Sequence, residues 1–182
     1  NFSESIAHGN PSGIDAATTS GSQPLYFEKG KAFLAFPLNI DAYLLVADTG
    51  ILGRTREAVA AVAQLKRTHP KQTNQLIADL GKLSRLTKEA IIHNQPQLLG
   101  YYMNQAQADL KALTVSNERL DTYIQLALDC GALGAKLTGG GRGGCFIVLC
   151  QDYQSALAIQ LQLKKAGVTD TWMQGLGVYE NV

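Results

Sequence analysis

A short loop near the start of the chain places one carboxylate where chemistry could use it. Residues 8–21 read HGNPSGIDAATTSG, and Gly9, Pro11 and Gly13 stiffen and turn the backbone just before Asp15. Small residues follow Asp15, as if a helix began there. We predict that this loop presents the Asp15 carboxylate to a substrate. An aspartate that only caps the following helix or closes a turn is the alternative that these residues leave open.

A second stretch, KLTGGGRGGCFIVLC, begins at Lys136 and concentrates glycine in one place. Gly139, Gly140 and Gly141 precede Arg142, and two further glycines follow it. Glycine loses more backbone freedom on folding than any other residue, so this run is costly for a turn alone. Consecutive free N–H groups form a concavity that binds anions. The run therefore predicts either a bound anion or the close approach of another backbone segment.

Cysteine and histidine indicate neither a disulfide framework nor a zinc site. Cys145 and Cys150 lie an odd number of positions apart in what reads as one strand, so their side chains point to opposite faces and cannot be joined. His8, His69 and His93 are dispersed, and no CxxC motif occurs.

Composition excludes several function classes. The chain has 182 residues, of which 46% are hydrophobic, and this is enough to bury the core of one domain. Its net charge is +1 and its basic residues are scattered, which favours neither a nucleic acid nor an anionic membrane as partner. No apolar stretch approaches the roughly 20 residues that span a bilayer, and the first residues do not resemble a signal peptide. We expect a cytosolic protein.

The elements that position the two loops follow from the hydrophobic pattern. The first fifty residues contain short apolar runs, PLYFEKG, KAFLAFPL and AYLLVADTG, that are typical of strands. From Arg54 onward apolar residues recur at helical spacing in four segments, with breaks at Pro70 and Pro96. Ser116 is the expected N-cap of the fourth segment.

The last third of the chain predicts a strand, a helix and a strand. CFIVLC is apolar on both faces and predicts a buried central strand. QDYQSALAIQLQLKKAG is amphipathic, and DTWMQGLGVYENV reads as a final strand. The whole pattern predicts an α+β fold in which helices pack on one face of a small antiparallel sheet.

The order of the two motifs carries a resemblance to a known family. GNPSGID, followed beyond several helices by KLTGGGRGGC, resembles the second half of the mevalonate kinases, which belong to the GHMP kinase superfamily with galactokinase, homoserine kinase and phosphomevalonate kinase. Between the motifs, DTGILGRTREAV is similar to the strand-to-helix segment in which the family places a substrate-contacting threonine, here Thr55. The resemblance covers essentially the whole chain.

The resemblance implies how the chain is divided. Residues 1–22 would be the end of an N-terminal kinase domain, and residues 23–182 a ferredoxin-like C-terminal domain. The family's phosphate loop, of the form P-x-x-x-G-L-G-S-S-A, has no match here, and neither has a lysine that the family places near its N-terminus. We therefore expect a C-terminal piece that is inactive alone.

The resemblance also implies a reaction and its cofactors. ATP would transfer its γ-phosphoryl group to the primary hydroxyl of mevalonate, with Asp15 accepting the proton as the new bond forms. Glu4 would be a ligand of Mg²⁺, which prefers oxygen and keeps several waters. A solvated terminal charge is the alternative for Glu4.

The remaining implied contacts lie on both motifs. His8, Ser12 and Thr55 would hydrogen-bond the substrate, and for each of them local backbone capping is the competing interpretation. Gly139, Gly140 and Gly141 would pack beside the phosphates of the nucleotide. Arg142 could face the same phosphates or remain a solvated side chain.

Other functions stay open at this point. A different kinase of the superfamily, such as phosphomevalonate kinase or galactokinase, is one alternative, whereas the acidic SGID loop argues against homoserine kinase. A non-catalytic binding module is another. The segment YYMNQAQADLKAL could pair two subunits as a homodimer, although a stripe that faces the core is the commoner reason for such a pattern.

Overall fold

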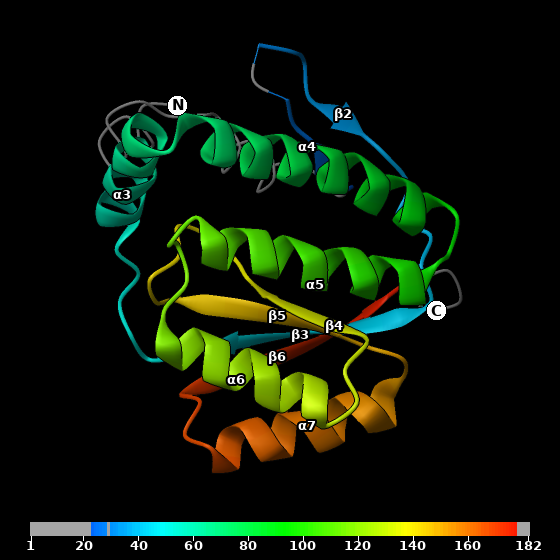
Figure 1. The fold of residues 1–182 in the computed structure, drawn as a ribbon. Coiled ribbons are helices and arrows are strands. Elements are labelled where there is room, and N and C mark those ends of the chain that lie inside the picture. The colour runs from blue at the N-terminus through cyan, green and yellow to red at the C-terminus, as the bar shows by residue number, and fades with distance from the viewer. Residues whose placement is uncertain (1–22, 29, 178–182) are drawn as a thin grey trace, which may run out of the picture.

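The centre of the fold is a four-stranded antiparallel sheet with strand order β4-β5-β3-β6 (Figure 1). This is a computed structural model, and it describes residues 23–28 and 30–177. The strands are β3 (Ala42–Asp48), β4 (Gly134–Leu137), β5 (Cys145–Cys150) and β6 (Asp170–Leu176). Because β5 lies between β4 and β3, the prediction that CFIVLC is a central strand is confirmed.

Two of the expected strands pair with each other instead of joining this sheet. β1 (Leu25–Tyr26) and β2 (Leu34–Ala35) form a separate short antiparallel hairpin. Half-exposed Leu34 belongs to it, so the hairpin buries little of its own surface. The main sheet begins only at β3.

Five helices surround the sheet in the part of the chain that the structure describes: α3 (Thr55–Thr68), α4 (Pro70–Ile92), α5 (Pro96–Ala112), α6 (Glu118–Asp129) and α7 (Tyr153–Lys165). Pro70 and Pro96 each occupy the first helical position, where the missing N–H costs nothing. Among the described residues, no helix is both long and apolar enough to cross a membrane.

The start of α6 differs from the expectation by one residue. Asn117, not Ser116, is the N-cap, and its side-chain oxygen accepts a hydrogen bond from the Leu120 backbone N at 2.8 Å. Asparagine caps helices as well as serine does. The Ser116 hydroxyl is thereby left for another hydrogen bond, described below.

The predicted α+β class is confirmed, but the helices cover both faces of the sheet. α6 and α7 pack on the face that carries Leu45, Phe146 and Val148. α4 and α5 lie over the opposite face, where they contact Ala42 and Leu149 (Figure 1). A central strand that is apolar on both faces must be covered on both faces, so the expectation of helices on one face only was wrong.

β4 is the element that the sequence pattern did not reveal. Its four residues, GAKL, begin with glycine, contain one lysine and run directly into the glycine-rich stretch. Such a segment is too short to show an alternating pattern. With β4 in place, the glycine-rich stretch becomes the connection of the β4–β5 hairpin.

Candidate functional site

The glycine loop, residues 138–144, is fastened to the segment that joins β3 to α3. The carbonyl oxygen of Gly144 accepts two hydrogen bonds from Thr49, one from its backbone N at 3.1 Å and one from Oγ1 at 2.8 Å. In return, the Gly144 backbone N donates to the Ile51 carbonyl at 2.6 Å, and the Arg54 N donates to the Gly141 carbonyl at 3.3 Å. Thr49 is buried. The loop is therefore held by a fixed backbone partner.

Several glycines are required because the β3–α3 segment and the α5–α6 connection come so close. A Cβ on Gly143 would lie 2.8 Å from the carbonyl oxygens of both Ile51 and Leu52. A Cβ on Gly140 would overlap the side chain of Thr55, and one on Gly141 would overlap the carbonyl oxygen of Val115. Of the two explanations that the sequence allowed for the run, close backbone approach is confirmed.

The same loop also contains backbone donors without a partner among the described residues; Gly139 is exposed and Gly140 half-buried, whereas Gly141 and Gly143 are buried. The backbone N–H groups of Gly139, Gly140, Gly141 and Gly143 donate to no other described residue. They lie beside the N-terminus of α3, since Gly140 is next to Thr55, the first residue of that helix. Free N–H groups and a helix N-terminus both favour a negatively charged ligand.

Thr55 is exposed at this junction, and its hydroxyl is available. The N-cap of α3 is Arg54, and its side chain makes no capping hydrogen bond. The Thr55 hydroxyl has no hydrogen-bond partner among the described residues. The structure thus gives no support to a capping role for Thr55 and places its side chain against the glycine loop, while its contact with a substrate stays a prediction.

Arg142 is tied down by a third segment. Its φ of 57° places it in the left-handed region, and its backbone N donates to the Val115 carbonyl at 2.8 Å. Its Nε donates to the Thr114 carbonyl at 3.2 Å, and its Nη1 lies 4.0 Å from Oε2 of Glu57. Arg142 is therefore a half-buried link between the glycine loop and the α5–α6 connection, and not a freely solvated side chain.

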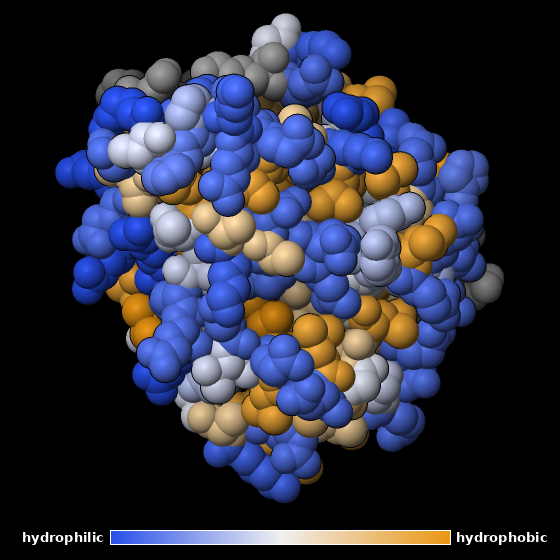
Figure 2. Space-filling view, in the orientation of Figure 1, coloured by the Kyte–Doolittle hydropathy of each residue, from blue (hydrophilic) through white to orange (hydrophobic). Residues whose placement is uncertain are grey.

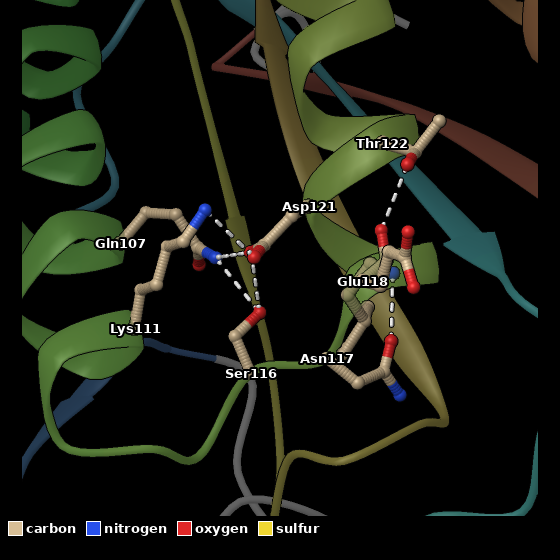
Figure 3. A network of polar contacts seen from close by, with 8 residues as sticks. Gln107, Lys111, Ser116, Asn117, Glu118, Asp121 and Thr122 are labelled. Atoms are coloured by element: carbon tan, nitrogen blue, oxygen red, sulfur yellow. Dashed lines mark hydrogen bonds and ion pairs between the residues drawn. The ribbon is translucent and has the colours of Figure 1, made fainter.

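A polar network centred on the buried side chain of Gln107 fixes that connection (Figure 3). Gln107 on α5 accepts from the backbone N of Leu137 at 2.9 Å and donates from Nε2 to Ser116 at 3.2 Å and to Asp121 at 3.3 Å. Ser116 donates to Oδ1 of Asp121 at 2.7 Å, and Lys111 pairs with Oδ2 at 3.0 Å. The network thereby fixes the end of β4 relative to the residues that bind Arg142.

Sequence reasoning did not find this network, although one signal was present. Gln107 is 8% exposed and falls next to Ala106 on the apolar stripe of α5. A glutamine inside such a stripe indicates a buried hydrogen-bond partner. That partner, the N–H of Leu137, could not be identified without knowing that β4 exists.

Four predicted site residues lie outside the described residues. They are Glu4, His8, Ser12 and Asp15, and their roles stay predictions. Within residues 23–28 and 30–177 no group of three or more His, Cys, Asp or Glu side chains could hold a metal ion. The described part of the site is therefore the junction of Thr55 with Gly139, Gly140 and Gly141.

Comparison with protein families and sequences gives one consistent result. Residues 87–169 match the family described as GHMP kinases C terminal. The mevalonate kinase of Thermococcus gammatolerans is 31% identical over 184 residues, which cover 97% of this chain and 54% of that protein. The mevalonate kinase of Aeropyrum pernix is 34% identical over 82% of this chain and 46% of its own length. The chain thus spans about half the length of the curated relatives that it matches.

Solved structures agree with the sequence matches. The L. major mevalonate kinase in complex with R-mevalonate superposes with a TM-score of 0.81 at 28% identity, over 93% of this chain and 54% of that one. The mevalonate kinase of methicillin-resistant Staphylococcus aureus gives a TM-score of 0.69 at 34% identity, over 97% of this chain and 56% of that one.

Proposed function

The chain belongs to the GHMP kinases, whose C-terminal domain it carries, and from this premise we propose that it forms the C-terminal part of a mevalonate kinase. The activity would be ATP-dependent phosphorylation of the primary hydroxyl of mevalonate. The observation that carries the proposal is the junction of Thr55 with the glycine loop, found in a chain whose relatives at 31–34% identity are named mevalonate kinase.

In this proposal the junction binds both reactants. The hydroxyl of Thr55 is free to hydrogen-bond the substrate, and the free N–H groups of Gly139, Gly140 and Gly141 suit the phosphates of ATP. Because the glycine loop is held by the β3–α3 segment and by the α5–α6 connection, these donors need no reorganisation when charge develops on the transferred group. Arg142 adds a positive charge to the same loop.

The proposed catalytic residue, metal ligand and remaining substrate contacts lie in the N-terminal residues 1–22. Asp15 accepts the proton of the attacking hydroxyl, Glu4 is a ligand of Mg²⁺, and His8 and Ser12 hydrogen-bond mevalonate. The metal ion, when bound, neutralises charge on the phosphates. Residues 1–22 belong to the end of the N-terminal kinase domain in this scheme, and residues 23–182 to the C-terminal domain.

A chimera tests the proposal. Residues 1–182 would be joined to the preceding part of the Thermococcus gammatolerans mevalonate kinase, and ADP release would be measured with ATP, Mg²⁺ and one acceptor at a time. We expect turnover with mevalonate and little with phosphomevalonate or galactose. Asp15→Asn should lower kcat by about 100-fold or more, since positioned acid–base groups contribute that much. Asp41→Asn, in an exposed position before β3, is the matched control and should leave kcat unchanged.

Three results would contradict the proposal. A folded chimera that prefers phosphomevalonate or galactose would assign the chain to another kinase of the superfamily. A folded chimera that transfers phosphate to no acceptor would favour a non-catalytic binding module. A loss of only a few-fold in kcat for Asp15→Asn would remove Asp15 from the reaction.

A further inference from the structure

A cavity lies between α4, α5 and the sheet. It has a volume of about 510 Å³, within the range of roughly 300–1,000 Å³ that small-molecule pockets occupy. Its walls include Leu83 and Ile91 from α4, Tyr102 and Met103 from α5, and Leu44 and Ile147 from the sheet. Neither Thr55 nor any residue of the glycine loop lines it.

The packing of the helices explains why this space is open. α5 packs along β4, whereas α4 packs mainly against α5 and α3 and makes few contacts with the strands. The apolar residues of the sheet on this face, such as Leu44 and Leu176, are therefore only partly covered. In Figure 2 apolar side chains are visible between the polar outer surfaces of α4 and α5.

Lys136 is the one charged residue among the described residues that line this cavity. It lies on β4 opposite Ile147 of β5, so its side chain enters the face that α4 and α5 cover. Its Nζ donates one hydrogen bond, to the carbonyl oxygen of Leu137 at 2.6 Å. No carboxylate of the described residues lies within ion-pair distance of it.

The ammonium group of Lys136 lacks further hydrogen-bond acceptors and a counter-charge among the described residues. It carries three donors and uses one of them in the described structure. Burying a charge is costly unless a counter-charge compensates it, and desolvation lowers the pKa of Lys136 accordingly. An apolar cavity with one uncompensated cation is complementary to a molecule that has an apolar body and one negative charge.

We propose that this cavity binds a single-chain amphiphile with a carboxylate head, its hydrocarbon chain between α4, α5 and the sheet and its carboxylate on Lys136. A carboxylate matches the single positive charge of Lys136. A phosphate monoester would bring a charge of about −1.5 to −2 and leave part of it uncompensated beside apolar walls. The cavity is separate from the junction of Thr55 and the glycine loop, so it provides a second ligand site that the proposed kinase activity does not use.

Calorimetric titration of the 182-residue chain tests this with decanoate, kept below the concentration at which it forms micelles. Octanoate should bind about fifteen-fold more weakly, because each buried methylene contributes about fourfold. Decanol, which has the same chain and no charge, should bind at least tenfold more weakly than decanoate. Decyl phosphate should also bind more weakly than decanoate.

Variants separate the head group from the chain. Lys136→Met should weaken decanoate binding at least tenfold and leave decanol binding unchanged, whereas Lys136→Arg should retain decanoate binding. Lys88→Met is the matched control, because Lys88 is a half-buried lysine on α4 that does not line the cavity, and it should bind decanoate normally. Leu83→Phe fills the cavity and should weaken decanoate and decanol alike.

The proposal has clear contrary outcomes. It is overturned if the unmodified chain does not bind decanoate, or if decyl phosphate binds more tightly than decanoate. It is equally overturned if Lys136→Met binds decanoate as the unmodified chain does. Each variant is first checked for cooperative thermal melting, and if Lys136→Met does not fold, Lys136→Gln replaces it in the same comparison.

Discussion

Gly140 of the glycine loop lies against Thr55 at the start of α3, so closely that a Cβ on Gly140 would overlap Oγ1 of Thr55. The two residues lie far apart in the sequence, and they meet because β3 and β5 are neighbours in the sheet. The contact joins a residue expected to bind the substrate to residues expected to bind phosphate. It can therefore be tested as a structural relationship, apart from any reaction.

We expect Gly140→Ala to lower the free energy of unfolding by about 1–3 kcal/mol, the usual cost of forcing an extra methyl group into a packed site. Thr55→Ala removes Oγ1 and Cγ2, the atoms that surround that methyl group, and should restore part of the loss in the double variant. Gly139→Ala is the control for the contact with Thr55. Its Cβ meets nothing within 4 Å, so the cost of alanine there comes from the φ of 73° alone. Urea denaturation gives all the values, and an absence of coupling between Thr55 and Gly140 would contradict the contact.

The polar network around Gln107 gives a second prediction. Gln107→Leu leaves the N–H of Leu137 and the Asp121 carboxylate each without one hydrogen bond, so we expect a loss of about 1–3 kcal/mol in the free energy of unfolding. Gln105→Leu, two positions away on the exposed side of α5, should stay within about 0.5 kcal/mol of the unmodified chain. Equal effects of the two substitutions would mean that Gln107 is not a structural link.

Much of the fold followed from sequence periodicity. The helices α3, α4 and α5 begin or end at the predicted prolines or close to Arg54, because proline and amphipathic spacing act locally. The central strand β5 could be predicted because it is apolar on both faces. β4 and the second helical layer could not, since a four-residue strand has no readable period and layer placement depends on contacts far apart in sequence.

The candidate site divides in the same way. The glycine run and Thr55 could be found from motifs, because close approach restricts residue type at single positions. Thr49 could not, since a buried threonine carries no local signature. Gln107 in the apolar stripe of α5 signals a buried partner but does not identify it, because tertiary packing sets that partner. The loop around Asp15 lies outside the described residues, so its geometry stays a prediction.

The three cysteines should differ sharply in reactivity. Cys130 is exposed, whereas Cys150 is fully buried, and burial together with the nearby Asp152 raises the pKa of its thiol to about 12. Only thiolates react, so at pH 8 we expect a thiol reagent to label Cys130 rapidly and Cys150 only after unfolding. Cys145 is half-buried with a raised pKa, from burial and from Asp48, and should react slowly.

Mass spectrometry of the labelled chain identifies the sites, and Cys130→Ser serves as the control because it should abolish the rapid phase. Rapid labelling of Cys150 in the folded chain would contradict its position on the α6 and α7 side of the sheet.

The pH dependence of stability gives a direct measure of the desolvation of Lys136. Burial lowers the pKa of Lys136 in the folded state from its ordinary 10.5. Between the two pKa values the unfolded chain binds more protons than the folded chain, so the free energy of unfolding must rise with pH there, by at most about 1.4 kcal/mol per pH unit. Below the folded pKa both states carry the charge, and the contribution of Lys136 is a constant cost. Lys136→Met lacks this rise.

Urea denaturation of Lys136→Met and Lys88→Met between pH 7 and 10.5 measures the effect, because both variants have lost one lysine and share the same net charge change. As the pH rises, the free energy of unfolding of Lys88→Met, which retains Lys136, should increase relative to that of Lys136→Met. Decanoate at saturation should reduce this increase with pH, since a carboxylate beside Lys136 favours its charged form and raises the pKa of Lys136 in the folded state. A difference that stays flat or falls with pH would mean that water reaches the ammonium group of Lys136 and that the cavity does not hold an uncompensated charge.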